Sequence, residues 1–154
     1  MQKAPGGALC SEQGTDWACS MSARQQILLV EDDRDDVFFM RRALEKTALG
    51  LPMQVVRDGQ QAVDYLAGVG KFTNRTEYPI PSIIFLDLKL PHIHGFDVLD
   101  WIRKQPSLKE IPVVILTSSP EQKDQQRAKQ LAANAYLIKP PTEEALLRVA
   151  QGWF

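Results

Sequence analysis

Five polar residues that could together perform phosphoryl or metal chemistry each stand at the end of a short apolar run. They are Glu31, Asp32, Asp87, Thr117 and Lys139. Three carboxylates held together repel one another unless a cation shares their site, and hard oxygen ligands without a nearby cysteine suit Mg²⁺. A hydroxyl and an ammonium opposite them would bind the oxygens of a phosphoryl group. The set therefore predicts a magnesium-dependent phosphoryl site, if the fold brings these residues together.

Parallel β-strands are the elements that would have to position these side chains. Apolar runs predict strands over residues 27–30, 53–57, 83–86, 112–116 and 134–138. Helical patterns alternate with them over residues 34–48, 60–67, 96–104, 121–132 and 143–151. This alternation favours an α/β fold whose parallel sheet is covered by helices on both faces. Because the carboxyl ends of parallel strands meet at one edge, the five polar residues are expected to converge there.

The first predicted helix carries more apolar residues than one helix face can bury. Its buried stripe is predicted to consist of Val37, Phe39, Met40, Ala43 and Leu44. Core packing is also the default for Phe38, but one of the two phenylalanines is expected to stay partly exposed. An exposed phenylalanine here would contribute to docking a partner.

Several other charged or ligating residues are given a structural interpretation. Asp33, Asp35 and Asp36 suit the N-terminal cap and first turn of a helix, where negative charge is favourable, better than a metal site. His92 and His94 lie in a proline-glycine loop without further ligands and are predicted to be surface residues. Residues 68–81 have no periodic pattern and are predicted to form an insertion on the surface.

The composition bounds the class of protein but names no partner. A length of 154 residues suits one domain, and a net charge of −1 without a long block of either sign gives no indication of nucleic-acid binding. No apolar run approaches the roughly 18 residues that span a bilayer, and no secretory signal is evident. A cytoplasmic location without a membrane partner is therefore expected, with Cys10 and Cys19 as free thiols.

The two ends of the chain lack the regular pattern of its middle. Residues 1–25 are predicted to be a mobile extension, with Met21 as an alternative start, and residues 26–154 to form the domain. Trp153 and Phe154 suggest a partner surface, so a homodimer seam is expected at this end, with core closure as the alternative. Because the sequence stops soon after the last predicted helix, no output domain is expected and output should pass through a protein contact.

Four motifs in order resemble the receiver domain of the two-component response regulators. They are LLVEDD, FLDLKLP with Gly95 after it, VILTSS and YLIKP, and each lies at a predicted strand end. The resemblance covers about residues 25–154. The phrase VEDDRDDVFFMRRAL and the long loop before the third strand are further similar to the single-domain regulators paired with bacterial phytochromes. This resemblance implies a doubly wound, flavodoxin-like sheet with the strand order 2-1-3-4-5.

The resemblance also implies a role for the acids and the lysine. Asp87 would be the phosphoacceptor, whose carboxylate attacks phosphorus to make an acyl phosphate. Asp32 and Asp87 would ligate Mg²⁺ together with the backbone carbonyl of Lys89, and Glu31 would act through water. Lys139 would pair with the phosphoryl oxygens or with Asp87.

Further positions carry implied roles in switching and in the lifetime of the acyl phosphate. Thr117 would bond a phosphoryl oxygen, and Tyr136 would be the switch aromatic that changes rotamer as Thr117 moves inward. The Lys139–Pro140 peptide bond is expected to be cis, an isomer accessible chiefly to bonds before proline. Lys89 and Ser119, each two residues beyond a site residue, would influence the acyl-phosphate lifetime.

A phosphorylatable switch is the function that the resemblance implies, rather than an enzyme that turns over a separate substrate. The protein would accept a phosphoryl group from a sensor histidine kinase, of the phytochrome type if the narrower resemblance holds. It would catalyse its own phosphorylation and dephosphorylation. A downstream phosphotransfer protein and a second copy of the chain are the further partners expected.

Three other functions compete with this one. A Mg²⁺-dependent aspartyl-phosphate phosphohydrolase of the haloacid-dehalogenase type also uses a strand-end aspartate and a lysine. That family places a second aspartate two residues after the nucleophile, where Lys89 stands here. A nucleotide-binding module would need a glycine-rich phosphate loop, and neither GxGxxG nor GxxxxGK followed by Ser or Thr occurs. An interaction domain that is not phosphorylated would be expected to lack some of the five site residues.

Overall fold

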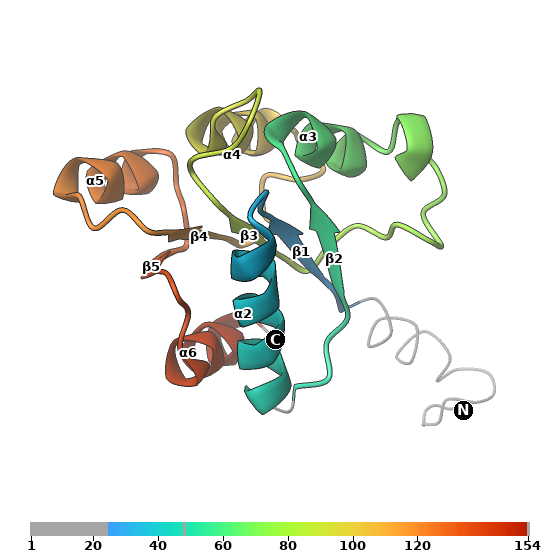
Figure 1. Ribbon diagram of the computed structural model, residues 1–154. Coiled ribbons are helices and arrows are strands. Elements are labelled where there is room, and N and C mark those ends of the chain that lie inside the picture. Colours follow the sequence, from blue (N-terminus) through green and yellow to red (C-terminus); the bar gives the residue numbers. More distant parts are fainter. Residues whose placement is uncertain (1–24, 48, 154) are drawn as a thin grey trace, which may run out of the picture.

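The computed structural model describes residues 25–47 and 49–153 of the chain, with side chains described to residue 151 (Figure 1). The predictions about the N-terminal extension, the start at Met21, and the thiols of Cys10 and Cys19 fall outside these residues. The prediction about Trp153 and Phe154 concerns side chains that are also outside them. Among the described residues, no helix is long and apolar enough to cross a membrane.

Five parallel strands form one sheet in the order β2-β1-β3-β4-β5, which confirms the predicted topology. The strands are β1 (Ile27–Val30), β2 (Met53–Val56), β3 (Ile83–Leu86), β4 (Val113–Thr117) and β5 (Ala135–Ile138). Each lies within one residue of its predicted bounds. The three inner strands are buried along their whole length, because helices cover both faces of the sheet.

Two helices cover one face of the sheet and three cover the other (Figure 1). On the first face are α2 (Arg34–Thr47) and α6 (Glu143–Trp153), and on the second are α3 (Gly59–Ala67), α4 (Gly95–Lys104) and α5 (Gln122–Gln130). A short 3₁₀ helix, η2 (Gly70–Phe72), follows α3. Helices were predicted in all five α-helical positions, and the doubly wound arrangement is therefore confirmed.

The alternation of side chains along each strand divides the apolar core into two layers. In β1, Ile27 and Leu29 pack with the α2 and α6 face, while Leu28 and Val30 pack with the α3, α4 and α5 face. Strands β3 and β4 alternate in the same way. The rigid double layer fixes the ends of the strands, which is where the polar residues lie.

The N-terminus of α2 is capped as predicted, but its buried stripe is narrower than predicted. Asp33 Oδ1 accepts hydrogen bonds from the backbone amides of Asp35, at 2.8 Å, and Asp36, at 3.3 Å. The expectation that one of the two phenylalanines stays partly exposed is confirmed, but burial of the other is wrong, because Phe38 and Phe39 are 54% and 49% exposed. The buried residues Val37, Met40 and Ala43 are spaced by three, and Phe38 and Phe39 point away from that stripe.

Residues 68–81, predicted to be a surface insertion, are anchored to the core. Phe72 is only 4% exposed and stacks against Tyr65, at a centroid distance of 5.1 Å. Arg75 donates hydrogen bonds to the carbonyl oxygens of Tyr65 and Leu66 at the end of α3 and to that of Tyr78 within the loop. The prediction missed these contacts because buried aromatic residues without a period leave no regular pattern in the sequence.

Candidate functional site

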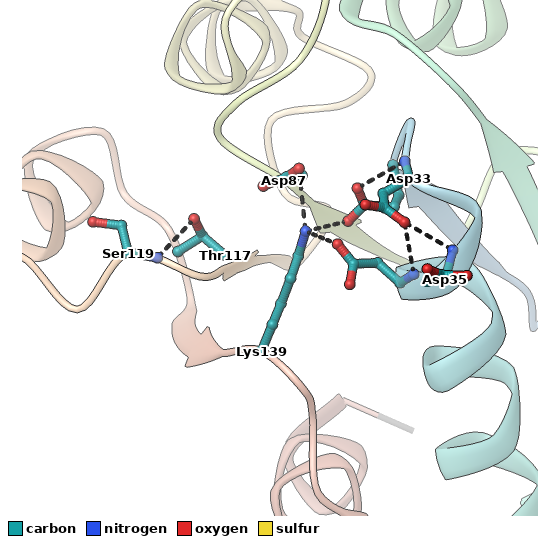
Figure 2. Close-up of polar contacts among 8 residues, drawn as sticks. Asp33, Asp35, Asp87, Thr117, Ser119 and Lys139 are labelled. Atoms are coloured by element: carbon teal, nitrogen blue, oxygen red, sulfur yellow. Dashed lines mark hydrogen bonds and ion pairs between the residues drawn. The ribbon is translucent and has the colours of Figure 1, made fainter.

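The carboxyl-terminal edge of the sheet brings the predicted site residues together (Figure 2). Backbone hydrogen bonds continue beyond the strands and fix the residues that follow them. The amide of Glu31 donates to the carbonyl of Val56 at 2.9 Å, and that of Asp87 donates to the carbonyl of Val30 at 3.1 Å. The amide of Lys139 donates to the carbonyl of Thr117 at 2.8 Å. The convergence predicted from strand ends is thus present in the fold.

The ammonium of Lys139 lies among three carboxylates. Its Nζ atom is 2.5 Å from Glu31 Oε1, 2.8 Å from Asp36 Oδ2 and 3.2 Å from Asp87 Oδ2. An ammonium has three N–H donors, so one donor is available for each carboxylate. The expected pairing of Lys139 with Asp87 is present, and the expected cis peptide between Lys139 and Pro140 is also present.

Asp36 is the residue of this site that the sequence analysis missed. It was interpreted as a first-turn charge only, yet its carboxylate pairs with a lysine 103 residues further along the chain. The sequence does contain an indication of this role. Asp36 precedes Met40 by four residues and Ala43 by seven, so it lies on the same helix face as the buried stripe of α2. A charge at the end of a buried stripe needs a polar partner, and Lys139 supplies it.

Three carboxylates form a candidate site for a cation. Single oxygen atoms of Glu31, Asp32 and Asp87 all lie within 4.8 Å of one another, and we call these three residues the carboxylate trio. Glu31 and Asp87 are buried, whereas Asp32 is exposed. The buried Glu31 Oε1 has an ion pair with Lys139 but no hydrogen bond of good geometry among the described residues. Hard oxygen donors with spare acceptor capacity fit a divalent cation such as Mg²⁺.

Burial and neighbouring charges shift the ionisation of this cluster. Burial raises the pKa of Glu31 to about 7, and the negative charge of Asp87 adds to that increase, while the contact with Lys139 opposes it. Burial by itself would lower the pKa of Lys139, but its hydrogen bond to Asp36, its ion pair with Glu31 and the charge of Asp87 raise it above its ordinary value. The ammonium is therefore charged at neutral pH, and one carboxylate beside it is poised to titrate.

Ser119 connects the two predicted switch residues. Thr117 is fully buried at the end of β4, and its Oγ1 accepts a 3.3 Å hydrogen bond from the amide of Ser119 (Figure 2). The hydroxyl of Tyr136, which is half-buried, donates a 2.8 Å hydrogen bond to the carbonyl of Ser119. The side chain of Ser119 in turn donates to Asp124 Oδ2 at 2.7 Å. The loop after β4 is therefore held by side chains from two strands and one helix.

The loop after Asp87 is shaped by the close approach of Gly95. A Cβ atom at Gly95 would collide with the carbonyl oxygen of Asp87 and the Cα atom of Leu88. The side chains of His92 and His94 are exposed, and His94 Nδ1 accepts a hydrogen bond from the amide of Phe96 at the start of α4. This surface placement agrees with the prediction for both histidines.

Lys89 lies in the same loop with an exposed side chain. The part assigned to its backbone carbonyl in metal binding remains a prediction.

Comparison with known proteins identifies relatives over most of the chain. Residues 27–151 match the sequence profile of the response regulator receiver domain. The chain is 36% identical over 126 residues to the response regulator Rcp1 of Synechocystis sp., covering 82% of this chain and 84% of Rcp1. It is 38% identical over 128 residues to a probable methanogenesis regulatory protein, FilR2, of Methanothrix harundinacea, covering 81% and 78%.

Solved structures include similar proteins as well. The bacteriophytochrome response regulator RtBRR superposes with a TM-score of 0.74 at 43% identity, covering 82% of this chain and 76% of that one. The Mn²⁺-bound form of Rcp1 superposes with a TM-score of 0.70 at 36% identity, covering 83% and 90%. A divalent metal site is thus present in a relative, as the carboxylate trio suggests here. The alternative of an aspartyl-phosphate phosphohydrolase finds no support.

Proposed function

The chain belongs to the response regulator receiver domain family, and from this premise we propose that Asp87 is its phosphoacceptor. The observation that carries the proposal is the setting of Asp87 at the sheet edge. Its carboxylate lies 3.2 Å from the Lys139 ammonium and beside two further acids. A carboxylate in such a place can attack phosphorus while the ammonium stabilises the charge that develops on the phosphoryl oxygens. Residues 26–154 would form the domain that carries this site.

The reaction that we infer is transfer from a phosphohistidine of a sensor kinase. A carboxylate oxygen of Asp87 forms a bond to phosphorus, and the bond from phosphorus to the histidine nitrogen breaks with its electron pair remaining on the imidazole. Lys139 donates hydrogen bonds to the transferred phosphoryl oxygens. Hydrolysis of the acyl phosphate restores Asp87. The protein would thus promote its own phosphorylation and dephosphorylation as a switch, without turning over a separate substrate.

Mg²⁺ is the cofactor that we propose for the carboxylate trio. Asp32 and Asp87 would bind it directly with the backbone carbonyl of Lys89, and Glu31 would bind it through water. When bound, the cation would neutralise the charge that the acids and the phosphoryl group share. The oxygen-only donor set and the Mn²⁺-bound relative support a divalent ion, and the preference of Mg²⁺ for carboxylates, waters and phosphate oxygens supports this choice.

Thr117 and Tyr136 are the switch residues that we propose. The Thr117 hydroxyl would have to leave the amide of Ser119 to bond a phosphoryl oxygen. Such a movement would displace Ser119, whose carbonyl holds the Tyr136 hydroxyl. Phosphorylation of Asp87 would in this way change the surface around β5. Lys89 and Ser119, two residues beyond Asp87 and Thr117, are placed to influence how long the acyl phosphate persists.

A sensor histidine kinase is the partner that the family implies, and we propose that α2 contributes to its docking. Phe38 and Phe39 stack edge to face at 5.7 Å on the exposed side of α2. They line a groove of about 420 Å³ together with Pro140 and Pro141, directly after Lys139. Two exposed aromatic rings beside the reactive edge would suit an apolar helical surface that presents the phosphohistidine.

The kind of kinase is a narrower proposal. Likeness to the bacteriophytochrome response regulator RtBRR supports a phytochrome-type kinase, although FilR2, at 38% identity, is a probable methanogenesis regulatory protein. A downstream phosphotransfer protein and a second copy of this chain are further partners that we propose, with a cytoplasmic location.

Intact mass after incubation with acetyl phosphate and Mg²⁺ tests the central proposal. The wild-type protein should gain one phosphoryl group, and Asp87→Asn should gain none, because the amide cannot form the acyl phosphate. A wild type that gains no mass, or an Asp87→Asn variant that gains the same mass, would contradict the assignment.

Docking through α2 needs a separate test with a phosphorylated phytochrome-type kinase as donor. Phe38→Ser should slow transfer from the kinase while leaving the rate with acetyl phosphate unchanged. The control is Val69→Ser, which changes a similarly exposed apolar side chain on the loop after α3. Equal rates for the two variants with the kinase donor would remove Phe38 from the docking surface.

A further inference from the structure

Asp36 shares the Lys139 ammonium with the carboxylate trio but does not belong to the trio. Its Oδ2 atom lies 2.8 Å from Lys139 Nζ, closer than the Oδ2 atom of Asp87 at 3.2 Å. Asp36 comes from the first turn of α2, whereas the members of the trio follow β1 and β3. The ammonium is therefore held from two directions.

A cation in the trio would change this balance. Glu31 and Asp87 would share their charge between the cation and the ammonium, whereas Asp36 lies outside the group of acids that can share the ion. Asp36 would therefore be the partner of Lys139 that the cation weakens least. The phosphoryl group must draw the ammonium away from Asp36, or share it with Asp36, when it arrives on Asp87.

We propose that Asp36 is a positioning residue that restrains the Lys139 ammonium on the α2 side of the site and competes for it with the incoming phosphoryl group. The proposal rests on the function proposed for Asp87. Asp36 does not touch the phosphoryl group in this scheme and acts through the lysine. It sets how readily the ammonium is available at the start of the reaction.

Two opposing effects decide the direction of the change when Asp36 loses its charge. Losing an anchor for Lys139 would slow phosphorylation, but Glu31 and Asp87 are 1% and 8% exposed and still hold the ammonium. The Asp36 side chain is 29% exposed, so water screens its ion pair with Lys139 more than it screens the pairs with Glu31 and Asp87. Removing it frees one donor of the ammonium and removes a negative charge close to an anionic phosphodonor. The second effect is the larger one, and phosphorylation should become faster.

The sequence offers a matched control one residue earlier. Asp35 lies in the same first turn of α2 and is exposed, and Lys139 pairs with Glu31, Asp36 and Asp87 rather than with it. Asp35→Asn and Asp36→Asn therefore remove the same charge from the same helix end. Only Asp36→Asn removes a partner of the ammonium.

The first measurement is the initial rate of phosphoryl addition from acetyl phosphate at saturating Mg²⁺, followed by intact mass. Asp36→Asn should react several-fold faster than wild type, and Asp35→Asn should stay within about twofold of it. Thermal unfolding of both variants verifies that they are folded. An Asp36→Asn rate at or below that of Asp35→Asn overturns the proposal. A wild type that gains no phosphoryl group, or an Asp87→Asn variant that gains one, overturns the proposed function instead.

A second measurement tests whether Asp36 acts through the lysine. In a Lys139→Met background, the ratio of the Asp36→Asn rate to the Asp35→Asn rate should fall toward one. The Lys139 ammonium should also shift its ¹H–¹⁵N NMR signal in Asp36→Asn and keep it in Asp35→Asn. A rate ratio that persists without the lysine, or an ammonium signal that does not move, would show that Asp36 acts by charge alone and would overturn its positioning role.

Discussion

The hydroxyl of Tyr136 is hydrogen bonded to the carbonyl oxygen of Ser119 at 2.8 Å. This contact joins β5 to the loop after β4, whose amide at Ser119 is bonded to Thr117. Tyr136 therefore stabilises the loop in the position that the structure shows. The amide of Ser119 donates to Thr117 and its carbonyl accepts from Tyr136, so both side chains hold the loop in the same position.

Tyr136→Phe should loosen the loop after β4 without unfolding the protein. The variant loses one partly buried hydrogen bond, so the free energy of unfolding should fall by about 1 kcal/mol. Hydrogen exchange of the amides of Ser118, Ser119 and Glu121 should become faster, while the amides of β1 and β3 keep their protection. Unchanged exchange in the loop would show that Tyr136 does not hold it.

Tyr65→Phe should be less stable than wild type at neutral pH, and this difference in stability should shrink at alkaline pH. The Tyr65 hydroxyl donates to the carbonyl of Pro79 and accepts from the side chain of Gln26, so its loss should cost about 1 kcal/mol. Burial raises the pKa of Tyr65 to about 12 from an ordinary value near 10.0.

Because the unfolded chain ionises first, stability from this group is present below pH 10 and is lost between pH 10 and pH 12. Urea unfolding of wild type and Tyr65→Phe across this range should therefore show a gap that narrows as the pH rises. A gap that stays constant or widens would contradict the raised pKa.

Glu31→Gln should make the metal-free protein less sensitive to pH. Burial raises the pKa of Glu31 from 4.5 to about 7, so the folded protein binds a proton more tightly than the unfolded chain. The associated stability is present below pH 4.5 and is lost as the pH rises to 7. Glutamine mimics the protonated side chain and should not show this loss.

Thermal unfolding in EDTA at pH 5 and pH 7.5 measures the difference between the two proteins. Relative to wild type, Glu31→Gln should have a higher free energy of unfolding at pH 7.5 than at pH 5, by no more than a few kcal/mol. Adding Mg²⁺ should then raise the melting temperature of wild type more than that of the variant, because a ligand that binds only the folded state stabilises it. Parallel pH profiles of the two proteins would contradict the raised pKa.

Gly95→Ala should be strongly destabilising, because the new methyl group would overlap the carbonyl oxygen of Asp87. We expect a loss of about 2–4 kcal/mol in the free energy of unfolding, together with slower phosphorylation as the Asp87 loop is displaced. Asp97→Asn, an exposed substitution in the first turn of α4, is the control and should cost less than about 1 kcal/mol. Similar losses for both would show that the loop yields to the methyl group.

Much of this site could be predicted because its residues follow strands, and strands leave a clear apolar pattern. That pattern alone predicted that Asp87 and Lys139 lie at one edge of the sheet. In the structure, Lys139 Nζ is 3.2 Å from Asp87 Oδ2. The pattern could not reveal Asp36, because its partner lies 103 residues away. The role of Asp36, a charged residue on a helix, becomes visible only once the fold shows which strand end lies beside it.

The aromatic residues were harder to place. The hydrophobic pattern predicted that one of Phe38 and Phe39 is buried, but both are exposed, because the contact between α2 and the sheet is too narrow to bury either ring. Conversely, Phe72 is buried in a segment without a pattern, because Tyr65 offers it an aromatic surface. In both cases, whether an aromatic side chain is buried depends on its neighbours in the fold, which the sequence does not give.

The contact between Asp36 and Lys139 also bears on how the chain matures during synthesis. Glu31, Asp36 and Asp87 are all synthesised before Lys139. Until then, the acids have no ammonium to offset their mutual repulsion, and β5 has not completed the sheet edge. This edge of the sheet can therefore be completed only after the last quarter of the sequence has been made. The electrostatic cluster joins segments that are distant in sequence, a kind of contact that forms more slowly than local ones.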